Sequence, residues 1–329
     1  METAAGVGDF GKLFRIIRNS SKSKKSTDIL LRDKNGQLIQ GKEDKLLRWV
    51  EHFDQQLNRT AMCPSNLVPP VRCEPYQANC EPPDLLEIAS AANKLKSKKA
   101  PGEDGIPPEI FKCCISALLG PLHTLFRTVW ETEIFPKDWA TSILLPIPKK
   151  GDTTKCENYR GISLIDIAAK LLTVIILNRF VAVRDARTRM NQGGFRRGRG
   201  CVDQIFTLRR ILEHRHKFQQ STTTCFIDFR AAFDSIDRDS LWNILKEDGM
   251  PEKLVGLIRS YYSNTQARVR AYGDESPEFP LNSGVRQGCP LSPVLFNYAI
   301  DWTMNRALAD YPGGSTWAGN LDCGPGVRG

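Results

Sequence analysis

The chain has 329 residues, which is enough for one large domain or two ordinary ones with a sizeable core. Hydrophobic residues make up 41% and charged residues 25%, so a wholly disordered, collagen-like or coiled-coil chain is excluded. The 46 Lys and Arg against 37 Asp and Glu leave a net charge of +9. Such a basic excess is typical of proteins that bind polyanions, but composition alone does not identify the partner.

The first part of the chain is predicted to be an N-terminal extension over residues 1–61. Its polar and basic start is followed by a hairpin over 29–39, because two apolar arms flank Asn35-Gly36, the pair that a type I′ turn favours. Apolar residues at helical spacing predict an amphipathic helix over 42–57. A Pro- and Cys-rich linker over 62–83 then separates this extension from the rest.

From residue 84 onward the pattern mixes helices and strands without a regular βαβ repeat, which favours the α+β class. The predicted helices cover 85–95, a start at 108, 167–183, 202–218, starts near 240 and 251, and 292–308. The predicted strands cover 142–147, 160–164, 222–229, 267–271 and 279–282. The tail over 311–329 is Gly-rich and aperiodic, so it is not expected to form a core element.

The cysteines and the apolar runs predict the compartment. Ten Cys stand at uneven spacing with no CxxC pair, which is typical of free thiols in a reducing compartment. No apolar run approaches the roughly 20 residues of a membrane helix, and the N-terminus carries no apolar leader. We therefore expect an intracellular protein, nuclear or cytoplasmic, that is not secreted and not inserted in a membrane.

Asp228 is a candidate metal ligand because it follows the apolar run Cys225-Phe226-Ile227 at the end of a predicted strand. A carboxylate at that place is suited to bind a cation, but it is equally suited to cap the next helix. Taken alone, the cap is the simpler interpretation, and other features of the chain have to decide.

Four further segments carry chemistry suited to phosphates and flat ligands. Lys149 and Lys150 end a predicted strand, and Arg160 begins the next one, where its guanidinium can clamp phosphate oxygens. The loop 194–199 is rich in Gly and Arg, which suits a nucleic-acid backbone, and the turn 284–290 contains a small Gly before a helix. Each segment alone resembles an ordinary surface loop.

In this order, the segments resemble the reverse transcriptases of non-LTR (LINE-type) retrotransposons, with the group II intron enzymes as relatives. The resemblance covers about residues 84–309, and RWVEHF (48–53) is similar to the segment that precedes the polymerase in such proteins. Its six motifs are APGEDGIPPEIFK (100–112), ILLPIPKKGD (143–152), ENYRGISLIDIAAKLLTVIILNRF (157–180), NQGGFRRGRGCVDQIFTLRRILE (191–213), CFIDFRAAFDSID (225–237) and GVRQGCPLSPVLFNYAID (284–301).

The resemblance implies a role for each matched residue. Asp228 would be the catalytic aspartate and metal ligand, with the backbone carbonyl of Phe229 as a second contact, and Phe233 would be the aromatic gate against a 2′-hydroxyl. The remaining implied contacts are Lys149, Lys150, Arg160, Gln287 and Gly288 to the incoming nucleotide, and Phe195, Arg196 and Arg199 to the template.

The implied protein is an RNA-directed DNA polymerase with right-hand fingers and palm over 84–310. It would use Mg²⁺, or alternatively Mn²⁺, in two-metal nucleotidyl transfer, with an RNA template, a DNA primer and deoxynucleoside triphosphates as partners. The sequence departs from the family because it contains no adjacent pair of aspartates. We therefore expect a chain truncated before the Ala-Asp-Asp motif, with an incomplete palm, no thumb and no measurable synthesis.

Two alternatives remain open at this stage. The first is a non-catalytic RNA- or DNA-binding remnant of such a polymerase. The second is a decayed product that does not fold stably, because a palm without its central strands would leave Phe226, Ile227 and the helix 292–308 poorly covered.

Overall fold

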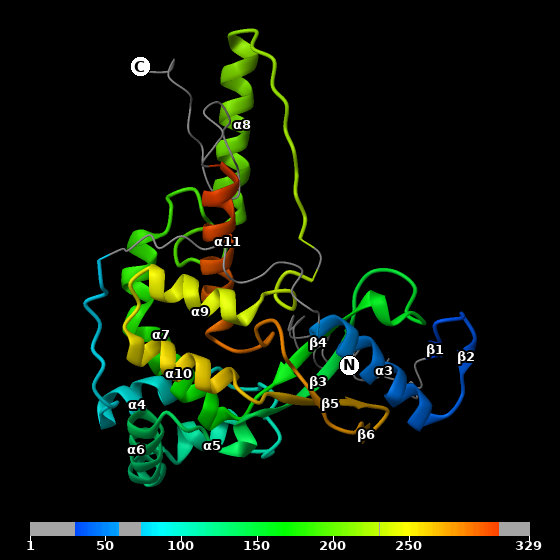
Figure 1. Cartoon of the computed structure of the whole chain (residues 1–329), viewed down its shortest axis with the longest axis vertical. Coiled ribbons are helices and arrows are strands. Elements are labelled where there is room, and N and C mark those ends of the chain that lie inside the picture. Colours follow the sequence, from blue (N-terminus) through cyan, green and yellow to red (C-terminus); the bar gives the residue numbers. More distant parts are fainter. Residues whose placement is uncertain (1–29, 59–73, 230, 309–329) are drawn as a thin grey trace, which may run out of the picture.

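The structure is a computed structural model that describes residues 30–58, 74–229 and 231–308. The predicted lead-in over 1–28, most of the predicted linker and the tail over 311–329 lie outside the described residues. The described chain combines helices with small sheets, which confirms the predicted mixture of α and β structure. A sheet covered by one helix lies on one side, and a helical body lies on the other (Figure 1).

The predicted N-terminal hairpin is confirmed, but its turn type is wrong. Strand β1 (Leu31–Arg32) pairs antiparallel with β2 (Leu38–Ile39). Between them, the Asp33 carboxylate accepts hydrogen bonds from the backbone N–H groups of Asn35 and Gln37. A type I′ turn needs positive φ at two residues, and here only Gly36 has it, at 83°. The hydrogen bonds of the Asp33 side chain therefore stabilise a longer loop, in which Gly36 has the left-handed backbone conformation.

The larger sheet has the order β4-β3-β5-β6, and β7 also pairs with β5. Strands β3 and β4 form a long antiparallel pair in which Ile147 lies opposite Arg160, whereas β3 and β5 run parallel. Strand β6 is an element that the sequence pattern did not predict. The strands are β3 (Thr141–Pro148), β4 (Tyr159–Leu164), β5 (Gln266–Ala271), β6 (Asp274–Glu275) and β7 (Phe279–Pro280).

Helix α3 (Lys42–Leu57) packs on this sheet, so the N-terminal extension shares a core with the strands. Trp49 and Phe53 of α3 are fully buried, and the Trp49 ring lies 4.8 Å from the Tyr159 ring of β4. The same cluster includes Leu144 of β3 and Val269 of β5. Burial of two aromatic side chains is a large apolar contribution, because each removes roughly 150–250 Å² from water.

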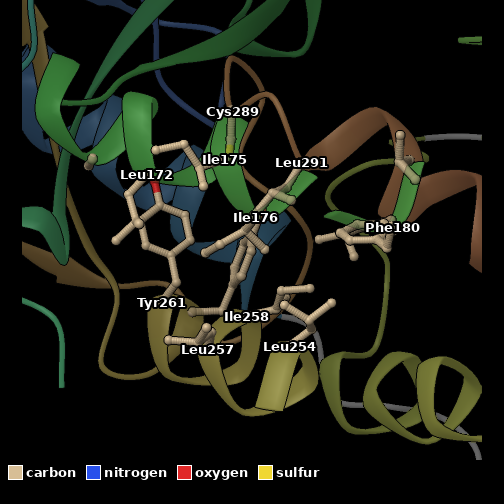
Figure 2. Close-up of a cluster of buried hydrophobic side chains, with 14 of the residues drawn as sticks. Leu172, Ile175, Ile176, Phe180, Leu254, Leu257, Ile258, Tyr261, Cys289 and Leu291 are labelled. Atoms are coloured by element: carbon tan, nitrogen blue, oxygen red, sulfur yellow. The ribbon is translucent and has the colours of Figure 1, made fainter. Parts of the chain in front are cut away.

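The helical body forms the second and larger core. Part of it lies between α7 and α10, where Ile176 is beside Ile258 and Tyr261 (Figure 2). The helices are α4 (Leu85–Asn93), α5 (Pro108–Cys113), α6 (Ile115–Thr132), α7 (Ile167–Arg187), α8 (Cys201–Lys217), α9 (Arg238–Glu247), α10 (Glu252–Tyr262) and α11 (Ser292–Leu308), with short 3₁₀ turns at Lys137–Trp139 and Cys156–Asn158.

Helix α8 and the segment that follows it stand apart from both cores. Helix α8 has no buried residue, and it projects from the body before the chain returns as an extended segment (Figure 1). The predicted strand over 222–229 is wrong, because no described strand lies beside this segment to supply hydrogen bonds. As expected for an uncovered segment, Phe226 is 83% and Ile227 69% exposed.

Across the three described ranges, no helix combines the length and the apolar character that a membrane span requires.

Candidate functional site

Three aromatic rings from distant segments meet at the centre of the candidate site. Phe233 stacks on Phe296 of α11 with ring centroids 4.8 Å apart and an interplanar angle of 12°. Phe195, from the Gly- and Arg-rich loop, meets Phe233 edge-on at 5.6 Å. Offset or edge-to-face contacts of this kind hold ring planes in a defined orientation. Two residues that the sequence assigned to different roles, Phe195 and Phe233, are therefore in contact.

The turn 284–288 is fastened to the chain segment that carries Phe233. The N–H of Val285 donates to the carbonyl of Phe233 at 2.8 Å, and the N–H of Gly284 donates to Ile236 at 2.7 Å. The backbones approach so closely that a Cβ at Gly284 would lie 2.7 Å from the Cα of Asp234. A glycine is therefore needed at this position.

The same turn is also fastened to strand β4. The N–H of Ser163 donates to the carbonyl of Gln287 at 2.7 Å. Gly288 has φ +123°, and a Cβ there would lie 2.5 Å from the carbonyl oxygen of Ser163. Gln287 and Gly288 thus lie against the sheet. The sequence predicted that the small residue at 288 admits a flat ligand, whereas the close approach seen here is to the backbone of Ser163.

Two arginines hold this arrangement, the buried Arg286 and the half-buried Arg238, and neither was among the predicted site residues. The Arg238 guanidinium donates to the carbonyls of Tyr262, Leu281 and Gly284, and burial lowers its pKa to about 10. Arg286 donates to the carbonyls of Trp139 and Ala140. No local pattern marks Arg238, because its partners lie 24 to 46 residues away. Arg286 lies inside the motif that begins at residue 284, so this motif could have identified it.

A small pocket beside the turn 284–288 is lined by Asp234, Gln287 and the end of α3. Asp234 is 6% exposed, and its carboxylate accepts hydrogen bonds from the side-chain amides of Gln287 (3.4 Å) and Gln56. A carboxylate that accepts two amide donors is well compensated for its burial. Sequence reasoning missed Gln56 because it lies outside the six motifs and 178 residues from Asp234.

The predicted phosphate contacts gather at the far end of the β3–β4 pair. The N–H of Lys149 donates to the carbonyl of Asn158 at 2.7 Å, which continues the pairing beyond the strands. Lys149, Lys150 and Arg160 are all exposed. Arg160 lies three residues before Ser163, or about 10 Å along the strand. The structure thus brings these three cations together at one end of β4 and places the turn 284–288 at the other.

The predicted template contacts fall into two groups. Arg196 donates to the carbonyls of Asp185, Arg189 and Gln192, so its guanidinium holds its own loop in place. Arg199, in contrast, is exposed and so directs its charge to solvent. Phe195, which has φ +54°, belongs to the aromatic cluster described above.

Asp228 and Phe229 lie in the extended segment before this cluster. Phe229 lines an open apolar groove between α9 and α11, whereas Asp228 is exposed and makes no hydrogen bond or ion pair with any described residue. Within the described ranges, no group of three His, Cys, Asp or Glu side chains is placed to hold a metal ion. One carboxylate is too few ligands for Mg²⁺ chemistry of the two-metal type, so the described residues do not fit that metal site.

Comparison with known protein families gives one match. The family described as "Reverse transcriptase (RNA-dependent DNA polymerase)" matches residues 147–318. The matched region contains every predicted site residue, from Lys149 to Gly288. It begins after helices α3 to α6, so the described residues before 147 lie outside the match.

Curated relatives come from mobile elements. A 115 kDa protein in the type-1 retrotransposable element R1DM of Drosophila melanogaster is 30% identical over 72% of this chain and 23% of its own length. The RNA-directed DNA polymerase from mobile element jockey of Drosophila funebris is 26% identical over 87% of this chain and 32% of its own length. The chain therefore spans less than a third of the length of either relative.

Among solved structures, a chain of a partial Cas6-RT-Cas1–Cas2 complex is similar at a TM-score of 0.38 and 17% identity, over 73% of this chain and 36% of the other. A likeness at this level carries no weight for fold or partners.

Proposed function

Because the chain belongs to the reverse transcriptase (RNA-dependent DNA polymerase) family, as part of the reverse transcriptase domain of a non-LTR retrotransposon, we propose that its described residues form the nucleotide- and template-facing side of an RNA-directed DNA polymerase. In this proposal, the sheet with α3 corresponds to the fingers, and α9, α11 and the segment between Phe233 and Asp237 correspond to part of the palm.

One observation carries the proposal. Phe195, Phe233 and the turn 284–288 come from three segments about 40 to 90 residues apart in the sequence, and they are joined in series. The Phe195 ring contacts the Phe233 ring, and the turn bonds to the Phe233 carbonyl and to β4. Gly288 and Phe195 are both exposed. Core packing therefore does not explain why Gly288 lies against Ser163 or why Phe195 contacts Phe233. A shared ligand surface for a base, a sugar and a phosphate chain explains why these residues converge.

In the proposed function, each part of the surface has its own partner. Phe233 stands against the sugar of the incoming deoxynucleotide, and its stack on Phe296 fixes the plane of the ring. Gln287 and Gly288 face the base pair, and Lys149, Lys150 and Arg160 bind the triphosphate as exposed cations at the end of β4. The loop of Phe195 follows the template backbone, where Arg199 supplies charge.

A divalent metal ion belongs to the proposed reaction, but the described residues offer it a single candidate carboxylate. When bound, Mg²⁺ would activate the primer hydroxyl and stabilise the leaving pyrophosphate. Asp228 would be one ligand, with the carbonyl of Phe229 beside it. The described residues supply no second carboxylate at this place, so we derive no step of the reaction through the metal.

The first experiment measures binding to an RNA template annealed to a DNA primer over a range of salt concentrations. We expect the log of the affinity to fall linearly with the log of salt, and Arg199→Ala to weaken binding and reduce that slope by about one. Arg259→Ala is the matched control, because Arg259 is equally exposed but lies on α10, away from the loop. Equal binding by both variants would argue against the proposed template surface.

A non-catalytic nucleic-acid-binding protein is the second candidate function. It is favoured by the exposure of Asp228 without a described partner and by the cations of α8, where the side chains of Arg209 and Arg210 are 76% and 66% exposed. Primer extension with Mg²⁺ and deoxynucleotides separates the two candidates. Extension that is lost in Asp228→Ala supports the polymerase. Salt-sensitive binding without extension, unchanged in Asp228→Ala, supports the binding protein.

A further inference from the structure

Helix α3 ends at the candidate nucleotide site although it lies outside the matched family region. The match begins at residue 147, and α3 ends at Leu57. Nevertheless, the last turn of α3 lines the same small pocket as Asp234 and Gln287. A helix that merely covered the sheet would need only its apolar face, which carries Trp49 and Phe53.

A polar contact joins α3 to the turn 284–288 through one carboxylate. The Gln56 side-chain amide donates to Oδ2 of Asp234, and the Gln287 amide donates to Oδ1 of the same residue at 3.4 Å. Asp234 directly follows Phe233, whose carbonyl accepts the N–H of Val285. The orientation of the Asp234 carboxylate is therefore shared among α3, the aromatic cluster and the turn.

A second set of contacts holds the end of α3 in register with this carboxylate. The hydroxyl of Ser283 lies 2.6 Å from the carbonyl oxygen of Leu57 and 3.1 Å from that of Asp234. The Asn58 side chain donates to the carbonyl of Pro280 and accepts from the N–H of Asn282. These contacts place Gln56 beside Asp234 without help from the Gln56 side chain itself.

We propose that Gln56 is a positioning residue, which orients Asp234 and through it the side chain of Gln287 and the backbone of Phe233. The inference rests on the proposed function, since it assigns Gln56 to the nucleotide side of that site. An amide suits this role because it donates to a carboxylate without neutralising it.

Amide hydrogen exchange of Gly284 and Val285 tests this role directly, because their N–H groups make the bonds that fasten the turn to residues 233 and 236. We expect Gln56→Leu to accelerate exchange of these two amides about tenfold, which corresponds to the loss of one hydrogen bond to a charged group. Exchange in α10 should not change. Gln55→Leu is the matched control, since Gln55 is the exposed neighbour on the same helix. Equal rates in the two variants, or acceleration throughout the chain, would overturn the proposal.

The affinity for dATP in the presence of Mg²⁺ connects this contact to the nucleotide. We expect several-fold weaker binding in Gln56→Leu than in Gln55→Leu. If exchange at Gly284 responds but dATP binds both variants equally, Gln56 serves the fold alone and the proposal is wrong. If the unmodified chain binds no dATP while exchange responds as expected, the positioning of the turn stands and the proposed function fails.

A second pair of variants tests the same role if Gln56→Leu does not fold. Gln56→Glu places a carboxylate against Asp234, and the repulsion between like charges should open the turn at least as strongly. Gln55→Glu carries the same charge change on the exposed neighbour. Similar exchange at Val285 in these two variants would also refute the role of Gln56.

Discussion

Replacement of Gly288 by alanine should separate the close contact at this turn from the cost of its backbone conformation. At φ +123°, any side chain is strained, and the added Cβ would lie 2.5 Å from the carbonyl oxygen of Ser163. Backbone strain of this kind costs about 1–3 kcal/mol. The contact adds to it, because relief of the overlap must move β4 away from the turn and so weaken the 2.7 Å hydrogen bond from Ser163 to Gln287.

Gly151→Ala is the matched control for the cost of placing a side chain at positive φ. Gly151 has a nearly identical φ of +120°, but its added Cβ would meet only the side chain of Asn158 at 3.1 Å, and that side chain can move. The difference between the two variants therefore reports the contact with Ser163. Because Ser163 is buried, we expect Gly288→Ala to lose about 1–2 kcal/mol more than Gly151→Ala, the value of one buried hydrogen bond and its unpaired partner.

Urea unfolding of both variants, followed by circular dichroism, measures this difference. At the same slope m, the midpoint of Gly288→Ala should lie below that of Gly151→Ala. If the two midpoints coincide, the turn does not press on β4 as described, and the placement of Gln287 against the sheet loses its support. A changed slope would instead indicate that the variant had altered the compactness of one of the two states.

Three further predictions concern other parts of the candidate site. Burial lowers the pKa of His52 from 6.5 to about 4, so the unfolded chain binds a proton at higher pH than the folded chain does. The free energy of unfolding should therefore fall by about 1–3 kcal/mol from pH 6.5 to 4. Urea midpoints at both pH values measure this fall, which should vanish in His52→Gln. Arg196→Ala should lower the thermal midpoint more than Arg199→Ala, because Arg196 donates to three backbone carbonyls, one of them in α7. Equal midpoints in calorimetry would contradict this. Phe226→Ser should leave the unfolding midpoint unchanged and reduce light scattering on concentration, since Phe226 is 83% exposed; a lower midpoint would show that this side chain is covered in solution.

Local patterns predicted most of the helices and strands because those patterns reflect burial on one face. The helix over 42–57 and the helix over 292–308 have the bounds that their apolar periodicity indicated. The strand over 222–229 failed for a physical reason: alternation of apolar residues indicates the ability to pair, but a strand exists only where a neighbour supplies hydrogen bonds. The hairpin turn failed because the Asp33 side chain competes for the backbone N–H groups that define its type.

The candidate site was predictable only where its chemistry lies within a motif. The motifs named Phe195, Phe233 and Gln287 separately, and the structure brings them together. Gln56 and Arg238 could not be predicted, because their partners are distant in the sequence and no local pattern indicates them. Arg196 shows the opposite difficulty. A basic loop pattern does not reveal which guanidinium is already occupied by carbonyls of the chain.

The two halves of the candidate site differ in how they are held. The turn 284–288, Phe233 and β4 are joined by backbone hydrogen bonds, and the side chains of Arg238 and Arg286 fasten the turn to the helical body. The segment with Asp228 contributes no hydrogen bond to this arrangement within the described chain. The surface proposed to bind nucleotide and template is thus built independently of the carboxylate proposed to bind metal. For this reason, variants of Asp228 should change chemistry without changing binding, and variants of the turn should change both.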